Sequence, residues 1–317
     1  RELLKRMARA GEDPAALDAI LITHEHQDHV AGLSTLARRL RIPVYFTEST
    51  HRAWVRMVTP RSTLTYAQWL DRVQQEKLAR AEAAAQQLVA DLSPDCGPYP
   101  SPDSSQELIE PALTEGEGTA PCASLPITLA AVSEEAEEKP PGPKADPAAL
   151  PAVEYFHSGA SFSIGDISIT PFTIPHDAAD PCGFVFESQA EGIRMALATD
   201  LGYMPPNVKA ALKRVDVLLL ESNHDLEMLR DGPYPWSVKQ RVLSRVGHLS
   251  NDATAEFLAG DYDGGAAWVV LGHLSEQNNA PELALLAAER AIAGRMNLLG
   301  NRILLARQSE PLSPICL

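Results

Sequence analysis

His24, His26, Asp28 and His29 are four residues of metal-binding types within six positions. Three of the chain's nine histidines lie in this run, Thr23-His24-Glu25-His26-Gln27-Asp28-His29. His24 and His26 alternate, so an extended backbone would turn both imidazoles to the same side. Imidazole and carboxylate groups are ligands that zinc, manganese and iron accept. The run therefore predicts a metal site rather than a polar loop with chance histidines.

The segments around this cluster alternate between strand and helix patterns. Residues 19–23 (AILIT) are apolar and partly β-branched, which indicates a buried strand directly before the cluster. Residues 30–40 (VAGLSTLARRL) predict a helix, and residues 43–47 (PVYFT) predict the next strand. This alternation is typical of an α/β architecture.

The cluster resembles the H-x-H-x-D-H signature of the metallo-β-lactamase superfamily. The resemblance implies further ligands at strand ends, in the order His, Asp, His. His176 follows ITPFTIP, Asp200 follows RMALAT, and His273 follows AAWVVLG. Each alone could be an ordinary cap or turn residue. Their agreement with the family order favours a common metal centre.

The resemblance also implies a fold and a division of the ligands. The implied fold is the αββα four-layer sandwich of the metallo-β-lactamase type. The implied cofactors are two divalent metal ions, zinc or manganese, which would lower the pKa of a shared water. The implied ligand sets are His24, His26 and His176 for one ion, Asp28, His29 and His273 for the other, and Asp200 as the bridge.

A further histidine, in Gly247-His248-Leu249-Ser250-Asn251, selects a branch of the superfamily. A helix is expected to begin at Asp252, with Ser250 or Asn251 as its cap, and free N–H groups there suit an anion. The phosphodiesterase branch, which includes ribonuclease Z-like enzymes, carries a histidine here that contacts the scissile phosphate or protonates the leaving oxygen. The resemblance therefore implies His248 and Asp28 as catalytic residues. The alternative for His248 is an ordinary loop histidine with a capping role.

Several longer phrases resemble a bacterial subfamily related to a double-stranded DNA 5′-exonuclease. They include PHDAADPCGF (175–184), LESNHD (220–225), GHLSN (247–251) and HLSEQNN (273–279). This resemblance implies DNA as the substrate and a link to DNA repair. The candidate substrate-binding residues are Ser250, Asn251, Asn278 and Asn279, although Asn278 and Asn279 could instead cap a helix before Pro281. Glu221 and His224 could orient ligands, touch substrate or simply hydrogen-bond at a strand end.

Residues 61–152 interrupt the pattern. They begin with a helix-like stretch rich in Ala, Gln, Glu and Arg and continue with a Pro- and Glu-rich segment that predicts disorder. We therefore expect one hydrolase domain in two parts, residues 1–60 and 153–317, with residues 61–152 as an insertion. The N-terminal part is expected to be incomplete, because the resemblance implies two or three earlier strands.

Charge argues against a nucleic-acid substrate, since the formal net charge is −15. The insertion holds 15 acidic and 6 basic residues, so the remainder is only mildly acidic. A small-molecule hydrolase for cyclic phosphodiesters, thioesters or lactones therefore stays open, as does a non-catalytic metal-binding regulator. A nuclease should line its cleft with basic residues, for which the candidates are Lys209, Lys213, Arg214, Lys239, Arg241 and Arg245.

Composition also bears on location. No run of eighteen or more apolar residues occurs, so no membrane span is expected. The four cysteines are widely spread and form no C-x-x-C pair, which fits a reducing compartment. We therefore expect a cytoplasmic protein. No sequence feature assigns an oligomeric state.

Overall fold

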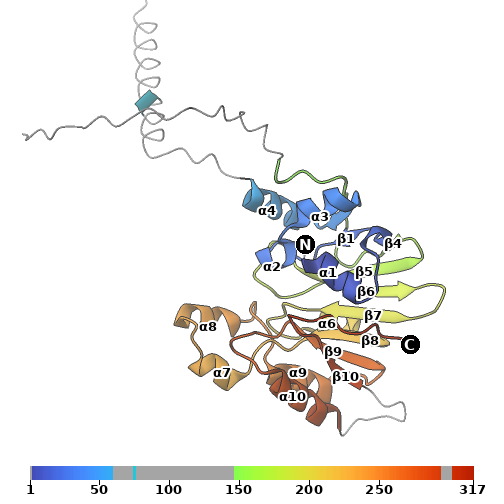
Figure 1. Ribbon diagram of the computed structural model, residues 1–317. Helices are drawn as coiled ribbons and strands as arrows, with labels where there is room; N and C mark the ends of the chain where they lie inside the picture. The colour runs from blue at the N-terminus through green and yellow to red at the C-terminus, as the bar shows by residue number, and fades with distance from the viewer. Residues whose placement is uncertain (1, 60–73, 76–145, 294–301) are drawn as a thin grey trace, which may run out of the picture. The chain divides into compact units, whose positions relative to one another are not determined.

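Two β-sheets of unequal size form the centre of the described chain (Figure 1). The computed structural model describes residues 2–59, 74–75, 146–293 and 302–317. The smaller sheet has three parallel strands, β1 (Ile20–Leu21), β2 (Val44–Phe46) and β3 (Val153–Tyr155), in that order. Its register pairs Ile20 with Val44 and Val44 with Val153. Segments from both sides of residues 61–152 therefore share one sheet.

The larger sheet has seven strands in the order β10-β9-β8-β7-β6-β5-β4. Its antiparallel half comprises β4 (Phe162–Ile164), β5 (Ile167–Thr173) and β6 (Cys182–Ser188), with β6 also antiparallel to β7 (Arg194–Ala198). Its parallel half continues from β7 through β8 (Val217–Glu221), β9 (Trp268–Gly272) and β10 (Arg302–Leu305). The carboxyl ends of β7, β8 and β9 consequently meet at one edge, and the loops that leave them begin there.

Helices precede or connect these strands. Before and after β1 and β2 the chain forms α1 (Glu2–Arg9), the 3₁₀ turn η1 (Pro14–Ala16), α2 (Gln27–Val30), α3 (Leu33–Leu40) and α4 (Glu48–Val58). Along the larger sheet it forms α6 (Pro206–Ala211), α7 (Leu226–Asp231), α8 (Trp236–Val242), α9 (Asn251–Gly260) and α10 (Pro281–Ala293). No described helix is long and apolar enough to cross a membrane.

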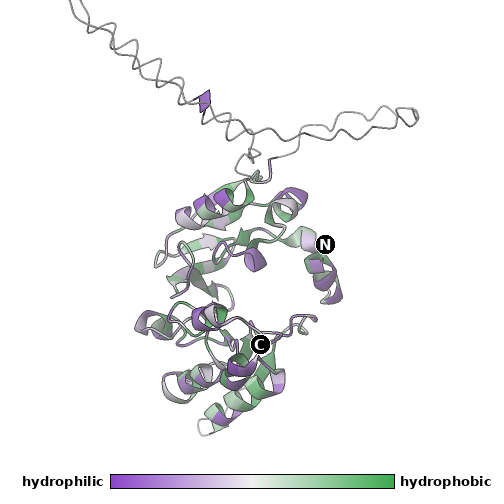
Figure 2. Cartoon of the chain, turned by 90° about the vertical axis from the view of Figure 1, so that its left-hand side faces the viewer, coloured by the Kyte–Doolittle hydropathy of each residue, from purple (hydrophilic) through white to green (hydrophobic). Residues whose placement is uncertain are grey.

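Three apolar clusters define the layers. The first packs Leu33 of α3 and Trp54 of α4 against Phe46 of the smaller sheet. The second packs α6, α9 and α10 against the outer face of the larger sheet. The third lies between the sheets, where the rings of Tyr45 and Phe162 stack at 5.4 Å. The order is helices, sheet, sheet, helices. In Figure 2 the outer helices carry both hydrophilic and hydrophobic colours, as elements with one buried face should.

Most of the predicted elements are present. The alternating pattern of residues 162–170 (FSIGDISIT) around Gly165 and Asp166 predicts a hairpin, and this prediction is confirmed by β4 and β5, with Ile164 paired to Ile167. The predicted helix at residues 30–40 is wrong as a single element, because Gly32 takes a left-handed φ of 76° and separates α2 from α3. The predicted character of residues 61–152 lies almost entirely outside the described residues.

Trp54 is the largest side chain in the cluster beneath α4 and is only 1% exposed. Trp54→Ala should lower the free energy of unfolding by about 3–5 kcal/mol, because the cavity that it leaves cannot close fully. Met57→Ala on the same helix is the control, since Met57 is 47% exposed and should change stability by at most about 0.5 kcal/mol. Urea unfolding of both variants measures the difference, and equal midpoints would contradict the packing described above.

Candidate metal centre

The loop between β1 and α2 is held so that its histidine rings face inward. The Thr23 hydroxyl lies 3.1 Å from Nδ1 of His24 and 3.2 Å from Nδ1 of His29. The Cys182 backbone N–H donates to the Thr23 carbonyl at 3.0 Å, and that of Ala179 donates to the Glu25 carboxylate at 2.9 Å. Because Nδ1 of each ring is engaged by Thr23, Nε2 is the atom left to face the site.

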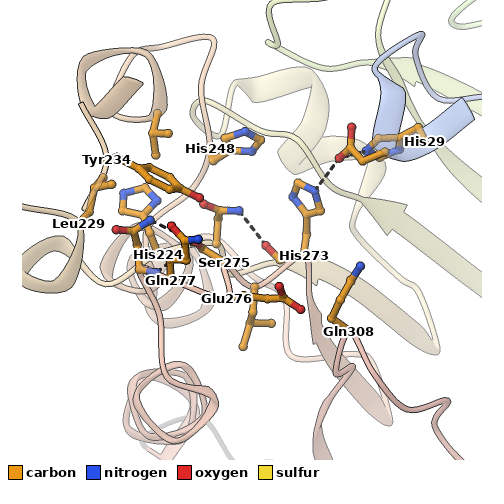
Figure 3. A pocket seen from close by; sticks show the side chains of 15 residues that line it. His29, His224, Leu229, Tyr234, His248, His273, Ser275, Glu276, Gln277 and Gln308 are labelled. Carbon is orange, nitrogen blue, oxygen red and sulfur yellow. Dashed lines mark hydrogen bonds and ion pairs between the residues drawn. The ribbon is translucent and has the colours of Figure 1, made fainter. Parts of the chain in front are cut away.

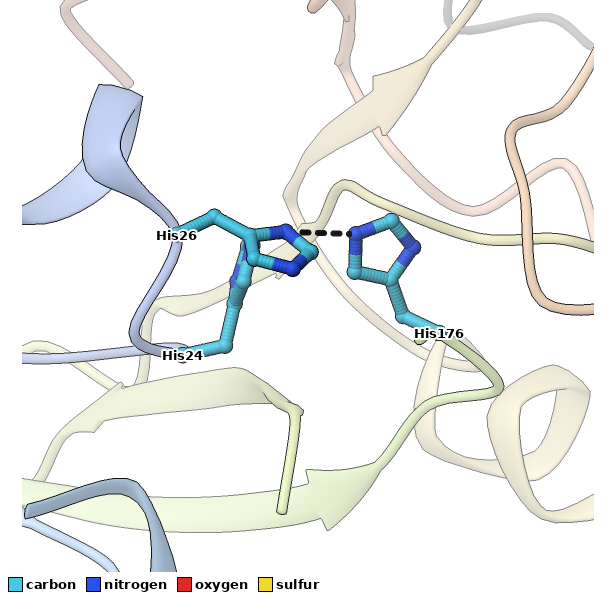
Figure 4. Close-up of side chains that lie close together, drawn as sticks. All are labelled: His24, His26 and His176. Atoms are coloured by element: carbon cyan, nitrogen blue, oxygen red, sulfur yellow. Dashed lines mark hydrogen bonds between the residues drawn. The ribbon is translucent and has the colours of Figure 1, made fainter. Parts of the chain in front are cut away.

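The first group of convergent side chains is His24, His26 and His176 (Figure 4), whose ligand atoms all lie within 4.8 Å of one another. Nδ1 of His26 is 3.2 Å from Nε2 of His176, and Nδ1 of His176 is 3.1 Å from the Gly247 carbonyl. Burial and the neighbouring charge of His29 together lower the pKa of His24 to about 3, so His24 is neutral at pH 7. Three imidazoles facing one point form a suitable nitrogen ligand set.

The second group is Asp28, His29 and His273, which also lie within 4.8 Å of one another. Nε2 of His29 is 3.4 Å from the Asp28 carboxylate, and Nε2 of His273 is 3.8 Å from it. Asp28 extends from the first turn of α2, while His273 follows β9. Residues far apart in the sequence therefore meet at one mixed nitrogen and oxygen site.

Asp200 lies between the two groups. Its Oδ1 is 4.0 Å from Nε2 of His24 and 3.5 Å from Nε2 of His273, and its Oδ2 is 3.4 Å from Nε2 of His29. Its side chain is only 2% exposed. Burial opposes ionisation of Asp200, but the neighbouring ring of His29, 3.4 Å away, and the charge of His273 outweigh it and hold the pKa well below its usual range. Asp200 is thus a carboxylate that both groups can share.

Asp200 and His273 both adopt left-handed backbone conformations, with φ of 63° and 56°. Each follows the end of a parallel strand, β7 or β9. A non-glycine residue in this region costs on the order of 1–3 kcal/mol and persists only where its surroundings impose it. The left-handed conformations therefore lower the local stability at Asp200 and His273, and they direct both side chains into the site.

Glu221 anchors the loops around the site and is fully buried at the end of β8. Its Oε1 accepts from Nδ1 of His248 at 2.8 Å and from Nδ1 of His273 at 2.7 Å. Its Oε2 accepts from the backbone N–H groups of Leu201 at 2.8 Å and Leu249 at 3.1 Å. Burial would raise the pKa of Glu221, but hydrogen bonds from the two histidines lower it. The ionised carboxylate thereby keeps Nε2 of both rings directed toward the site.

The sequence leaves the role of Glu221 open between orienting ligands, touching substrate and hydrogen bonding at a strand end. The last role is the usual one for a glutamate in that position. The one sequence feature that points to Glu221 is its position directly after the apolar run VDVLLL. A buried charged group that makes four hydrogen bonds, as Glu221 does, is expected to fix the positions of the groups bonded to it.

The side chains fit divalent cations by two tests. Nε2 of His24 and Oδ2 of Asp200 are buried and have no hydrogen-bond partner among the described residues. Such atoms cost about 1–3 kcal/mol each when nothing satisfies them. The donor set is imidazole and carboxylate, which suits zinc, manganese or iron. Cys182 lies behind the loop near the Thr23 carbonyl, and burial raises the pKa of its thiol, so it offers no thiolate.

The predicted substrate-binding residues differ in their surroundings. The Ser250 hydroxyl accepts from the Ala253 N–H and caps α9, which begins at Asn251. The side-chain amides of Asn251 and Asn279 bond to each other in both directions, at 2.8 and 3.0 Å. These three side chains are engaged inside the protein. Asn278 differs, since its Oδ1 is buried without a hydrogen-bond partner among the described residues.

Two cavities adjoin the site. One of about 580 Å³ is lined by residues that include His29, His248 and His273 (Figure 3). The other, of about 320 Å³, is lined by residues that include His26, His176 and Arg241. His248, whose side chain is 21% exposed, borders both. A substrate in either cavity would reach the candidate metal ligands.

Of the six predicted cleft cations, only Arg241 lines these two cavities, and it donates to the Asp177 carboxylate. Lys209 pairs with Asp261 at 2.6 Å, and Arg245 lies 4.3 Å from the centre of the Tyr203 ring. Lys239 is 9% exposed and donates to two backbone carbonyls. Lys213 and Arg214 precede β8, at the opposite end of the strand from Glu221. Five of the six candidate basic residues therefore do not line these two cavities.

Comparison with known proteins identifies the type of domain. The family model described as "Beta-lactamase superfamily domain" matches residues 1–89 and 111–273. The chain is 28% identical over 293 residues to the exodeoxyribonuclease WalJ of Streptococcus pneumoniae, covering 92% of this chain and 77% of that protein. It is 28% identical over 276 residues to the exodeoxyribonuclease YycJ of Bacillus anthracis, covering 87% and 71%.

A solved structure bears on the fold alone. The metallo-β-lactamase fold protein YhfI of Bacillus subtilis superposes with a TM-score of 0.50 at 12% identity, covering 94% of this chain and 78% of that one. The sandwich fold implied by the sequence resemblance is confirmed.

Metal binding should release protons from the metal-free protein. Burial lowers the pKa of His29 and His273, but the nearby carboxylates of Asp200 and Asp28 raise the first to about 9, and those of Asp28 and Glu221 raise the second to about 11. Both rings therefore hold an extra proton at pH 7.5 and must lose it to bind a cation. Calorimetric titration in two buffers of different ionisation enthalpy should show release of about two protons per chain. His273→Gln should release about one fewer, and identical heats in both buffers would contradict the prediction.

Gly247 tests the support of His176 and His248. A Cβ there would lie 2.1 Å from the Val242 carbonyl oxygen, so Gly247→Ala must displace the backbone that carries His248 and whose carbonyl lies 3.1 Å from Nδ1 of His176. We expect metal affinity to fall by about 10–100-fold. Gly260→Ala in α9 is the control, because a Cβ there meets no described atom within 4 Å. Zinc titration of both variants measures the effect, and unchanged affinity in Gly247→Ala would show that the loop tolerates displacement.

Proposed function

The chain belongs to the family described as the beta-lactamase superfamily domain. We propose that it is a metal-dependent phosphodiester hydrolase that degrades DNA as an exonuclease. The two curated relatives named above, both exodeoxyribonucleases, match along most of the chain and support a DNA substrate. The observation that carries the hydrolase chemistry is the buried Asp200 carboxylate between two groups of convergent imidazole and carboxylate side chains.

We propose two divalent ions, zinc or manganese. The ligands would be His24, His26 and His176 for one ion and Asp28, His29 and His273 for the other, with Asp200 shared. When bound, the ions would supply Lewis acidity toward phosphate oxygens and would lower the pKa of water in the site. The proposed hydrolase domain comprises residues 1–60 and 153–317, with residues 61–152 as an insertion.

His248 is proposed to act on the substrate directly. Glu221 holds its Nδ1, and the ring borders both cavities, so its Nε2 can donate a hydrogen bond to a phosphate oxygen or a proton to the leaving oxygen. Asp28 is the most exposed of the proposed ligands, with 65% of its side chain accessible, and it lines both cavities. We propose that Asp28 contributes to catalysis as well as to metal binding.

The proposed setting is the cytoplasm, with DNA under repair as one source of substrate. A second candidate function is hydrolysis of a small phosphodiester, thioester or lactone. The observation that favours it is the position of the basic side chains, since only Arg241 of the six lines the described cavities. The net charge of −15 points the same way.

The test is degradation of end-labelled double-stranded DNA by the manganese- or zinc-loaded protein. Asp200→Ala should lose bound metal and at least about 10²-fold in activity, because the shared carboxylate is removed. His248→Ala should keep its metal and lose about 10²–10⁴-fold in activity, as expected for a general acid. Metal content and cleavage rate are measured on the same samples, and the labelled end reports the direction.

His157→Ala is the matched control, because His157 is exposed and lies outside both cavities. A protein that holds metal and leaves DNA intact, but hydrolyses bis(4-nitrophenyl) phosphate, a thioester or a lactone, would replace the first candidate function by the second.

A further inference from the structure

The larger cavity beside the candidate metal centre has a floor that the proposed hydrolysis does not use. The cavity, of about 580 Å³, shares Asp28, His29, His248 and His273 with the site, and extends from them toward Tyr234 and His224 (Figure 3). It is large enough to hold a small organic ligand. A phosphate held at the shared side chains would therefore have its neighbouring group in this cavity.

Two buried polar side chains in this cavity have unsatisfied hydrogen-bonding atoms. His224 and Asn278 are each 1% exposed. Neither ring nitrogen of His224 has a hydrogen-bond partner among the described residues, and neither does Oδ1 of Asn278. Most buried polar atoms in native proteins are hydrogen-bonded, so three exceptions lining one cavity call for a partner that arrives from outside.

Both residues are fixed by their backbones rather than by their side chains. The His224 carbonyl accepts from the Asn251 N–H at 2.8 Å, and the Asn278 carbonyl accepts from the Asp225 N–H at 2.9 Å. Asn278 also donates from Nδ2 to the Ser275 hydroxyl at 3.3 Å. The remaining side-chain atoms are consequently held in place and have no partner of their own among the described residues.

The charge of the cavity restricts the ligand. Its described lining contains the carboxylates of Asp28 and Glu276 and no lysine or arginine. A second phosphate in the part of the cavity away from the candidate metal ligands would meet these carboxylates and no lysine or arginine. Of the unpartnered atoms it could accept only from a His224 N–H, and it would leave Oδ1 of Asn278 facing another acceptor.

An uncharged group with both donors and acceptors fits better. A neutral imidazole offers one donor and one acceptor, and Oδ1 of Asn278 offers a further acceptor. Nucleobase edges carry donors and acceptors side by side. The Tyr234 ring and the side chains of Leu229 and Leu274 add flat or apolar surface of the kind on which a base packs.

We propose that this cavity binds the nucleoside next to the scissile phosphate, with His224 and Asn278 hydrogen-bonded to its base. The inference rests on the proposed DNA hydrolysis and names the substrate group that the site recognises beside the phosphate. His224 is thus a substrate-binding residue with no part in metal coordination.

The first experiment uses duplexes in which the terminal or the penultimate nucleotide is replaced by an abasic tetrahydrofuran residue. For the unsubstituted protein, one of these positions should slow single-turnover cleavage about tenfold, as expected for two lost hydrogen bonds. His224→Phe removes one of these two bonds, so it should cleave intact DNA about threefold more slowly and lose only about a further threefold on that abasic duplex. Equal cleavage of both abasic duplexes and intact DNA, or losses that multiply in the variant, would overturn the proposal.

The second measurement does not depend on DNA cleavage. Thymidine or deoxyadenosine is added to the metal-loaded protein, and the imidazole carbon-bound proton signals are followed by NMR. The His224 signals should shift while those of the exposed His157 stay in place, and the shift should be absent in His224→Phe. No shift at His224 with either nucleoside would overturn the nucleoside site. Failure to cut DNA, together with a retained shift, would remove the proposed function and leave the cavity assignment standing.

Stability separates this role from a structural one. His224→Phe replaces an unsatisfied buried ring by an apolar one of similar shape, so its melting temperature should equal or exceed that of the unsubstituted protein. A fall in melting temperature accompanied by loss of activity on base-containing and abasic DNA alike would assign His224 a structural role and overturn the proposal.

Discussion

The buried carboxylate of Glu221 is the interaction on which the rest of the site depends. It joins four segments that the chain brings from different places: the turn after β7, the end of β8, the loop before α9 and the turn after β9. Each bond alone contributes modestly, but a buried ionised carboxylate without them would be strongly unfavourable. Because the buried carboxylate is stable in its ionised form only while these donors surround it, the loops and the two histidine rings are ordered together.

The parallel half of the larger sheet explains why those segments meet. β7, β8 and β9 run side by side in the same direction, so Asp200, Glu221 and His273 emerge from one edge. The loop after β1 reaches the same place, because the Thr23 carbonyl accepts a hydrogen bond from Cys182 at the start of β6. The left-handed conformations of Asp200 and His273 complete the arrangement by turning the chain away immediately after each ligand-type side chain. Local strain is located where the geometry requires it.

Sequence patterns were sufficient where one short segment contains the whole signal. The run from His24 to His29, the hairpin around Gly165 and the cap at Ser250 could each be predicted, since the determining residues are neighbours. Three features could not be predicted, because they depend on partners distant in sequence. Gly32 divides a continuous helical pattern by adopting a left-handed φ. Lys239 has the composition of a cleft cation, but its ammonium group is held by the carbonyls of Arg230 and Gly232. Glu221 has no local sign of its four donors.

The paired amides of Asn251 and Asn279 have an evolutionary consequence. Each amide supplies both the donor and the acceptor that the other requires, and both side chains are buried. Replacement of either one alone leaves a buried amide atom of the other without its partner, and joint replacement by apolar residues would still strand the buried Ser222 hydroxyl and carbonyl, which bond to the same two amides. The two positions, 28 residues apart, are therefore epistatic. A lineage that alters one must pass through a less stable intermediate, so the pair is expected to be inherited as a unit.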